Sequence, residues 1–355
     1  MRKRRTLLAL QIAGIFVLVL ATGPFVSIAA ERDLPKRVSF ALGQVGTSAY
    51  AMGSGLAKVA SKSGPILVVA QATAGPAAFV HEMDKKGVPE LALLGAIDAW
   101  QSLTGKISAE PVPGDPRKKP PYWPPTPNIR ALLQVPPLFL GFLVRDNSPM
   151  KTVADIKGKR MAWEFPGFPP NIPSTLAYMT CAGLTLKDVV PVPITGLVAA
   201  VEALIDGRID TTTAAVGMGA VAEADAKIGV RFLQQTSAGP EWVKKAQMIM
   251  PGSYIAVRKA GPAGVKVDTP LWTKPYYIVC TNHMSDTAAY ELIKVWWEHH
   301  QETWPIHVEM KDFKPEIFAT DVVSIPYHNG AVKFYKEKGV WTAQLEQTQK
   351  RFFQK

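Results

Sequence analysis

The sequence predicts an α/β fold with a mostly parallel sheet, built as two similar units. Short apolar segments of strand length alternate with segments whose apolar residues recur at helical spacing, and turns rich in glycine separate them. The 355 residues are 47% hydrophobic and 19% charged, which is typical of a folded protein with a large core. The length favours two domains, with one large domain as the alternative.

The first unit begins with a predicted strand over residues 37–42, which breaks at Gly43. Thr47 or Ser48 is expected to cap the helix that follows, because a hydroxyl at this position accepts a hydrogen bond from a first-turn amide. The alternation continues with strands over 66–70 and 91–94 and a helix from Ala77. The segment over 129–144 is apolar and extended, and it is a candidate for the connection to the second unit.

The second unit repeats the alternation. The predicted strands cover residues 160–164, 189–194 and 209–216, and the predicted helices cover residues 174–182 and 197–205. Asp286 is expected to cap a later, aromatic-rich helix that runs through Trp304. A helical segment over 331–338 closes the ordered region, and residues 341–355 form a polar, amphipathic tail.

The first thirty residues have the pattern of a secretory signal peptide. Four basic residues precede an almost unbroken apolar stretch over residues 7–26, and small residues at 27–30 offer a cleavage site. Arg4 and Arg5 loosely resemble a twin-arginine signal. The apolar stretch is long for a signal peptide, so an uncleaved membrane anchor is the alternative. We expect the mature protein in the periplasm.

Charge and cysteine content exclude several kinds of protein. The net charge is +11, or +7 without the four basic residues at the N-terminus, and no basic run is interleaved with aromatics as in nucleic-acid-binding proteins. We predict that Cys181 and Cys280 are separate buried thiols, with a disulfide as the alternative.

The proline-rich residues 111–127 are expected to form an extended surface loop, either a stiff insertion or a partner contact.

Motifs of catalysis are absent from the sequence. There is no Gly-x-Ser-x-Gly elbow, and His81-Glu82 does not continue to His-Glu-x-x-His. Residues 217–222 fit Gly-x-Gly-x-x-Ala after a strand, but the next strand ends in Gln234-Gln235 and not in the acidic residue of a dinucleotide site. No cysteine or histidine spacing indicates zinc. We therefore predict no enzyme, no metal site and no cofactor.

Three loops follow successive strands of the first unit. They cover residues 46–50, 73–76 and 95–98. In open α/β sheets ligands bind at the carboxyl ends of the strands, where helix N-termini present free backbone N–H groups to anions. One such turn is common in any α/β protein, whereas three at successive strand ends indicate a binding site.

Several segments resemble a known family of receptors. Residues 151–160 resemble the "s-v-x-D-L-k-G-K-r" entry to the second lobe of type II solute-binding proteins. More specifically, residues 46–50, 251–254 and 325–337 resemble the "G-G-T-Y-Y" loop, the "P-A-G-T-Y" segment and the "I-P-L-H-P-G-A-x-x-Y-Y-K-E" box of the TAXI branch of TRAP transporter receptors. The resemblance runs in order through nearly the whole mature chain.

This resemblance implies a two-lobed, periplasmic-binding-protein-like fold of type II with the ligand cleft between the lobes. Lobe I is expected over residues 37–135 and 255–340, and lobe II over 136–254. The implied function is capture of a small organic solute, typically a carboxylate or an amino acid, by a monomer that delivers it to an ion-coupled TRAP-type permease. A ligand sensor for a membrane receptor is the main alternative, and a periplasmic enzyme is a weaker one.

The resemblance also nominates residues of the binding site. The positions that match the family pattern are Gly46, Thr47, Ser48, Tyr50, Thr73, Gly75, Asp98 and Tyr254. The loop of the second lobe departs from the "G-x-x-G-S-G-T" of the family, because it contains four prolines, which lack an N–H donor. Its candidate residues are Trp163, Phe165, Phe168, Ser174 and Thr175. The aromatic side chains favour a bulkier or less charged ligand, with a buried cluster that only holds the loop as the alternative.

Overall fold

An eight-stranded sheet runs through the described part of the chain, which comprises residues 34–106, 125–166, 168 and 171–354 of the computed structural model. Six strands follow the order β2–β1–β3–β10–β4–β7, while β8 pairs with β4 and β9 with β10. A separate parallel pair is formed by β5 and β6. The bounds are β1 Arg37–Leu42, β2 Leu67–Ala72, β3 Leu91–Gly95, β4 Ile129–Arg145, β5 Arg160–Glu164, β6 Val190–Ile194, β7 Thr212–Ala215, β8 Val230–Phe232, β9 Tyr254–Arg258 and β10 Thr269–Thr281.

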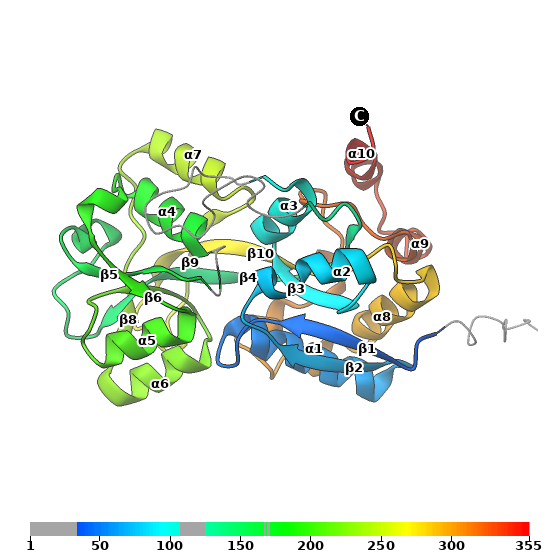
Figure 1. Ribbon diagram of the computed structural model, residues 1–355, viewed down its shortest axis with the longest axis horizontal. Helices are drawn as coiled ribbons and strands as arrows, with labels where there is room; N and C mark the ends of the chain where they lie inside the picture. The colour runs from blue at the N-terminus through cyan, green and yellow to red at the C-terminus, as the bar shows by residue number, and fades with distance from the viewer. Residues whose placement is uncertain (1–33, 107–124, 167, 169–170, 355) are drawn as a thin grey trace, which may run out of the picture. The chain divides into compact units, whose positions relative to one another are not determined.

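Helices cover both faces of these sheets, as the ribbon in Figure 1 shows. Near β5 and β6, α4 packs with α7 on one side and α5 packs with α6 on the other, while α1 and α8 pack together beside β1. The bounds are α1 Ser48–Ser63, α2 Val80–Lys86, α3 Ala96–Thr104, α4 Asn171–Cys181, α5 Leu197–Ile205, α6 Gly219–Ile228, α7 Pro240–Ile249, α8 Asp286–Glu298, α9 Asn329–Glu337 and α10 Ala343–Arg351.

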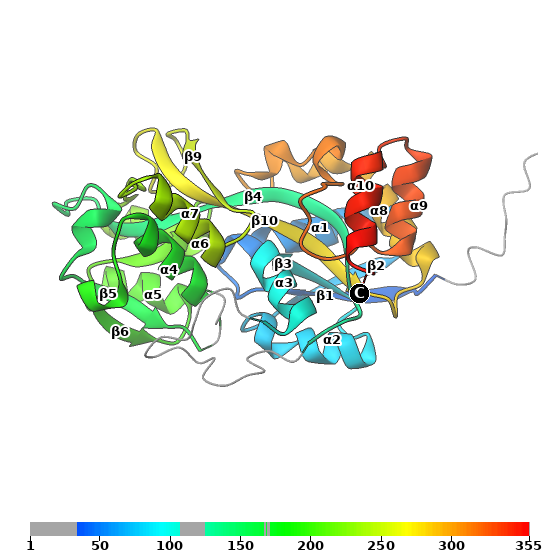
Figure 2. The same cartoon turned by 90° about the horizontal axis from the view of Figure 1, so that it is seen from above.

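Two long strands, β4 and β10, pass from one lobe into the other (Figure 2). The last part of β10 lies between β3 and the first part of β4, whereas the other end of β4 pairs with β7 and β8 and the other end of β10 pairs with β9. Their register shifts where Pro136 and Pro137 of β4 stand opposite Pro275 of β10. Because proline has no N–H, the ladder loses hydrogen bonds at this point.

The core of the second lobe depends on aromatic packing beside α4. The ring of Tyr178 stacks on Trp272 with centroids 6.1 Å apart, and Phe142 meets Tyr178 edge-on at 6.2 Å. All three side chains are completely buried. Trp272 comes from β10 and Phe142 from β4, so the two crossing strands anchor this core as well as the core of the first lobe.

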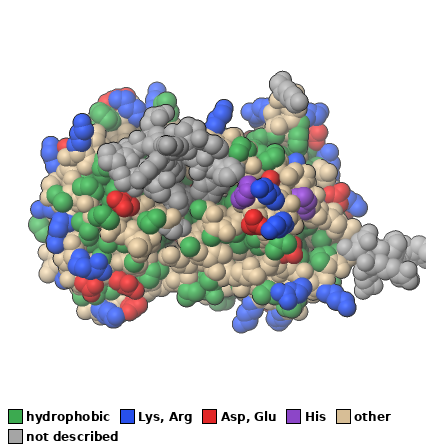
Figure 3. Space-filling model, in the orientation of Figure 1, with side chains coloured by type: hydrophobic (Ala, Val, Ile, Leu, Met, Phe, Trp, Pro, Cys, Tyr) green, Lys and Arg blue, Asp and Glu red, His purple; other side chains and the backbone are tan. Residues whose placement is uncertain are grey.

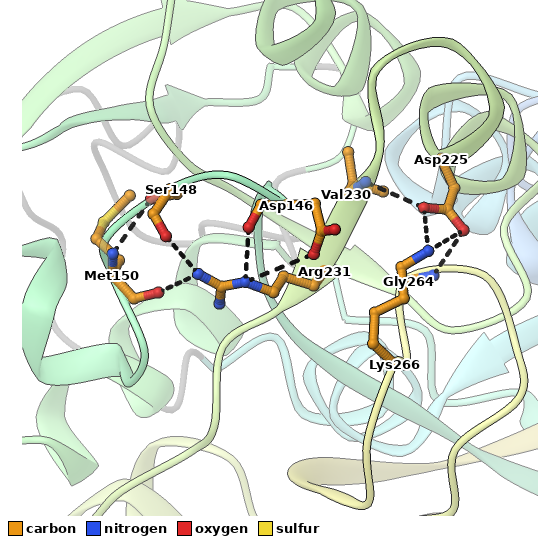
Figure 4. Close-up of polar contacts among 8 residues, drawn as sticks. All are labelled: Asp146, Ser148, Met150, Asp225, Val230, Arg231, Gly264 and Lys266. Atoms are coloured by element: carbon orange, nitrogen blue, oxygen red, sulfur yellow. Dashed lines mark hydrogen bonds and ion pairs between the residues drawn. The ribbon is translucent and has the colours of Figure 1, made fainter.

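Two side chains tie surface loops of the second lobe to β8 (Figure 4). Arg231 donates from Nη2 to the carbonyl oxygens of Ser148 and Met150, at 2.7 and 2.5 Å. Asp225 accepts from the N–H groups of Val230 and Gly264 and from Nζ of Lys266. These contacts fix the start and middle of β8 and the turn before β10.

Most predicted elements lie close to the observed ones, but the expectation of a mostly parallel sheet is wrong. In the eight-stranded sheet β1 pairs in parallel with β2 and β3, whereas β10 pairs antiparallel with β3, β4 and β9, and β4 pairs antiparallel with β7 and β8. The cause is that the two crossing strands, β4 and β10, run against their neighbours. The strand predicted over 37–42 matches β1.

The helix predicted to begin with Asp286 as its cap and to reach Trp304 is wrong at both ends. Ser285 is the cap, since its hydroxyl accepts from the N–H of Ala288, and Asp286 is the first helical residue. The helix α8 stops at Glu298, because His299 leaves helical backbone angles, and a separate 3-10 turn follows at His300–Thr303. The tail predicted over 341–355 contains α10, whose Leu345 is buried.

Two further expectations concern cysteines and surface charge. Cys181 and Cys280 are both buried and free, which confirms the prediction of separate thiols. Lys and Arg side chains are scattered over the face shown in Figure 3 and do not gather in one patch. The predicted signal peptide lies outside the described residues, as does most of the proline-rich segment over 111–127.

Candidate ligand-binding site

A pocket opens where the two lobes meet, beside the middle of β4 and β10. The space between its lining atoms amounts to about 630 Å³, counting the part open to solvent. The lining consists of Gly43, Gln44, Thr47, Ser48, Ala49, Ala74, Leu138, Leu140, Phe168, Asn171, Ser174, Leu197, Thr213, Ala214, Ala215, Met218, Lys274 and Tyr276.

The first lobe contributes the N-terminus of α1 to the pocket. Thr47 caps this helix, since its hydroxyl accepts from the N–H of Tyr50 at 3.2 Å. The Ser48 hydroxyl donates to the carbonyl of Val216 at 3.0 Å, which joins the helix to the second lobe. First-turn amides have no partner within their own helix and carry the positive end of the helix dipole. The end of α1 therefore favours electron-rich groups in the pocket.

The second lobe contributes a polar wall from α4 and β7. Asn171 donates from Nδ2 to the Thr213 hydroxyl at 2.9 Å, and the Thr175 hydroxyl lies 3.5 Å from the same oxygen. All three residues are buried. The Asn171 amide is thereby held at the start of α4, where it faces the pocket together with Ser174.

The loop before α4 brings an aromatic ring to the same wall. Glu164 and Phe165 both have positive φ, 77° and 41°, which side chains other than glycine rarely adopt. This turn leads from β5 to Phe168, whose ring lines the pocket, while Phe165 is completely buried. Backbone strain of this kind concentrates at functional sites.

The charged group of the lining is Lys274, in the middle of β10. Its side chain is only 3% exposed, and Nζ lies 3.5 Å from Oδ2 of Asp98, whose side chain is 1% exposed. Oδ2 also accepts from the N–H of Gly95 at 3.1 Å. Burial raises the pKa of the Asp98 carboxyl, and Lys274 and the Gly95 amide act in the opposite direction. The pair places a buried cation against the pocket.

The structure brings four of the nominated residues into the lining: Thr47, Ser48, Phe168 and Ser174. Others lie just behind it. Gly46 has φ of 90° and turns the chain into α1, Thr175 supports the Asn171 wall, and Asp98 stands behind Lys274. Thr73 donates to the carbonyl of Leu42, next to the pocket residue Ala74.

The remaining nominated residues do not line the pocket. Trp163 and Phe165 are buried in the core, as in the alternative in which aromatics only hold the loop. Tyr50 is half-buried on α1, and Gly75 follows Ala74 with φ of 149°. Tyr254 is 48% exposed at the start of β9.

Sequence reasoning missed Lys274, Tyr276, Asn171, Thr213 and Met218, all of which line the pocket. A signal existed for Lys274, because a lysine inside the otherwise apolar strand β10 has to be buried with a partner. No comparable signal marks Thr213 or Met218, which reach the pocket only through tertiary packing.

The glycine motif at residues 217–222 forms a tight turn between β7 and α6. Gly217 has φ of 80°, and a Cβ built on it would lie 2.2 Å from Nε2 of the buried His307. Glycine is therefore required there by the backbone angle and by the close approach of a side chain. In the described part of the chain, no group of three or more His, Cys, Asp or Glu residues is arranged to hold a metal ion.

The comparison with protein families identifies the chain. A family model, the NMT1-like family, matches residues 40–339. The chain belongs to the NMT1-like family. Its match begins in β1 and ends just after α9, so it spans both lobes and the whole pocket.

Solved structures resemble this NMT1-like protein in fold. An R. palustris protein solved with adipate is 13% identical, with a TM-score of 0.50, over 90% of this chain and 99% of that one. The aliphatic sulphonate-binding protein SsuA of Escherichia coli is 15% identical, with a TM-score of 0.46, over 90% and 100%. The likeness to the R. palustris protein, together with the two crossing strands, confirms the predicted two-lobed α/β fold. None of the helices in the described residues has both the length and the hydropathy needed to cross a bilayer.

Proposed function

We propose that this NMT1-like protein is a periplasmic solute receptor that captures a small organic molecule between its lobes. The observation that carries the proposal is the composition of the pocket wall. Thr47 and Ser48 come from the first lobe, Asn171 and Thr213 from the second, and Lys274 from a strand that crosses between them. A bound solute would contact both lobes at once and hold them together, as hinge closure requires.

The partner we propose is a TRAP-type, ion-coupled permease, in keeping with the TAXI-like motifs at residues 46–50, 251–254 and 325–337. The receptor would act as a monomer in the periplasm and deliver a carboxylate or similar solute without consuming ATP. Uptake of the solute by cells or vesicles that contain receptor and permease should then collapse with the ion gradient and persist without ATP. Uptake that needs ATP, or a receptor that regulates a kinase and supports no uptake, contradicts this partnership.

Solute capture itself is tested by native mass spectrometry of the mature, exported protein, followed by denaturation and identification of any released compound. We expect one small molecule per chain, recovered chemically unchanged. Leu197→Trp should abolish this retention, because Leu197 lines the pocket and the larger ring would fill it. Met248→Trp is the matched control, since Met248 is 74% exposed on α7.

Three results would contradict the proposal. Release of a reaction product would indicate an enzyme. Retention in Leu197→Trp would place the molecule elsewhere on the protein. Loss in both tryptophan variants would show that the effect does not depend on the pocket.

A further inference from the structure

The ion pair of Lys274 and Asp98 is incompletely satisfied. The Nζ–Oδ2 distance of 3.5 Å is long for a charge-assisted hydrogen bond, which is usually about 2.7–2.9 Å. Within the described residues, Oδ1 of Asp98 has no hydrogen-bond partner at all. Buried ionised groups are normally fully hydrogen-bonded. The Lys274 ammonium therefore has donors to spare at the surface of the pocket.

The surroundings hold this ammonium in place without using those donors. Nζ lies 5.3 Å from the ring centroid of Tyr276 and 5.9 Å from that of Phe168, within the range of cation–π attraction. A Cβ built on Gly95 would lie 2.2 Å from Cε of Lys274, so only glycine leaves room for the lysine stem. The cation is thus packed on its stem and on two aromatic rings, and it is held from behind by Asp98.

Among the described residues, the rest of the lining carries no second ion of either sign. Apart from Lys274 and the phenol of Tyr276, the lining side chains are neutral amides, hydroxyls and apolar groups. Leu138, Leu140 and Met218 supply aliphatic surface on the same pocket. A ligand that completes the coordination of Nζ has to bring an acceptor with negative charge, and its remaining body meets a largely apolar wall.

We propose that Lys274 binds the acid group of the captured solute, and that this solute is a small organic anion with an apolar body. Asp98 is the counter-ion of Lys274 in the structure. The inference rests on the proposed function, because it names the ligand class of the same site. Carboxylates and sulfonates share the required chemistry, and the experiment below separates them.

The test uses isothermal titration calorimetry on the mature, solute-free protein with three probes: hexanoate, hexanesulfonate and the neutral hexanamide. Wild-type protein should bind at least one of the two anions about tenfold more tightly than hexanamide, or better, as expected for a hydrogen bond to a charged group. The anion that binds more tightly identifies the acid group.

Lys274→Gln alone would leave Asp98 buried and unpaired, and the resulting loss of stability makes this variant unsuitable for titration. The decisive variant is therefore the double change Lys274→Gln with Asp98→Asn, which removes both charges. Its preference for anion over amide should fall to about one. Lys259→Gln is the matched control, since Lys259 is 76% exposed and paired with Asp268, and it should keep the preference of the wild type.

Three results would overturn the inference, and they bear differently on solute capture. Equal affinity of the wild type for hexanamide and both anions would refute the role of Lys274, while the pocket would still bind a solute. An anion preference that survives in the double variant would place the acid group elsewhere. Binding of no probe would refute the proposed ligand class. The proposal of solute capture would be refuted as well only if mass spectrometry also finds no solute.

Discussion

Removing Lys274 should destabilise the protein strongly, and by an amount that depends on pH. Lys274→Gln leaves the Asp98 carboxylate in a site where its side chain is 1% exposed. Breaking a buried ion pair by removing one partner typically costs about 3–5 kcal/mol, because the remaining charge is uncompensated. We expect a loss of this size in the free energy of unfolding near pH 8.

The pH dependence follows from the direction of the Asp98 pKa. Burial already raises this pKa, and Lys274 is the first of the groups that lower it again, so the variant should have a still higher value. A carboxyl whose pKa is higher in the folded state contributes most stability below its unfolded pKa, and that contribution is lost as pH rises through the folded pKa. Near pH 5 more of the Asp98 population in the variant is protonated and neutral, so the loss caused by Lys274→Gln should be smaller there.

Urea unfolding near pH 5 and near pH 8 measures both effects, with Lys259→Gln as the exposed control. Adding Asp98→Asn to Lys274→Gln should recover part of the stability, since no buried charge remains. If Lys274→Gln lowers the free energy of unfolding near pH 8 by an amount within about 0.5 kcal/mol of the control, the Lys274–Asp98 pair is not buried from solvent as in the structure. An equal loss at both pH values would refute the argument from the Asp98 carboxyl.

Three other perturbations have outcomes fixed by single contacts. Gly95→Ala places a Cβ 2.2 Å from Cε of Lys274 and should lower the free energy of unfolding by about 1–3 kcal/mol through overpacking. Urea unfolding measures this loss, and calorimetry should show weaker anion binding. Unchanged stability and binding would contradict the tight fit. Burial lowers the pKa of His307 to about 4, so the contribution of neutral His307 to the free energy of unfolding is present above its unfolded pKa and is lost as pH falls. Between pH 7 and pH 5 the wild type should lose about 2 kcal/mol in the free energy of unfolding from this group. His307→Gln should not show this loss. Thr213→Val removes the oxygen that accepts from Asn171 at 2.9 Å and should lower the free energy of unfolding by about 1–2 kcal/mol. It should also reduce solute retention in native mass spectrometry. Unaltered retention would show that the wall formed by Asn171 and Thr213 does not take part in binding.

The loops of the first lobe were predictable because their signals are local. The strand, the glycine turn and the capping residue of α1 follow one another within residues 37–48, so each indicates the next. The resulting prediction placed Thr47 and Ser48 at a strand end, and the structure places both in the pocket lining. No tertiary information was needed for this step.

The second wall was harder to predict because an aromatic residue is apolar in a core and in a pocket alike. Trp163, Phe165 and Phe168 lie within one loop of similar composition, yet only Phe168 lines the pocket. Two consecutive residues with positive φ, Glu164 and Phe165, decide which ring faces which way. Neither glutamate nor phenylalanine predicts a positive φ, since glycine and asparagine are the usual residues at such positions.

The strand β10 would couple ligand binding to lobe geometry if the solute binds as proposed. Lys274 and Tyr276, which line the pocket, flank Pro275, and Pro275 stands opposite Pro136 and Pro137 where the ladder changes register. Bending of the sheet at this point breaks few hydrogen bonds, because none of the three prolines has an N–H to donate. The proposed anion at Lys274 would sit next to these prolines, where the ladder has few hydrogen bonds to break. A rotation of one lobe there changes the distance between the two walls of the pocket, and the charge that attracts the solute stays with the strand that both lobes share.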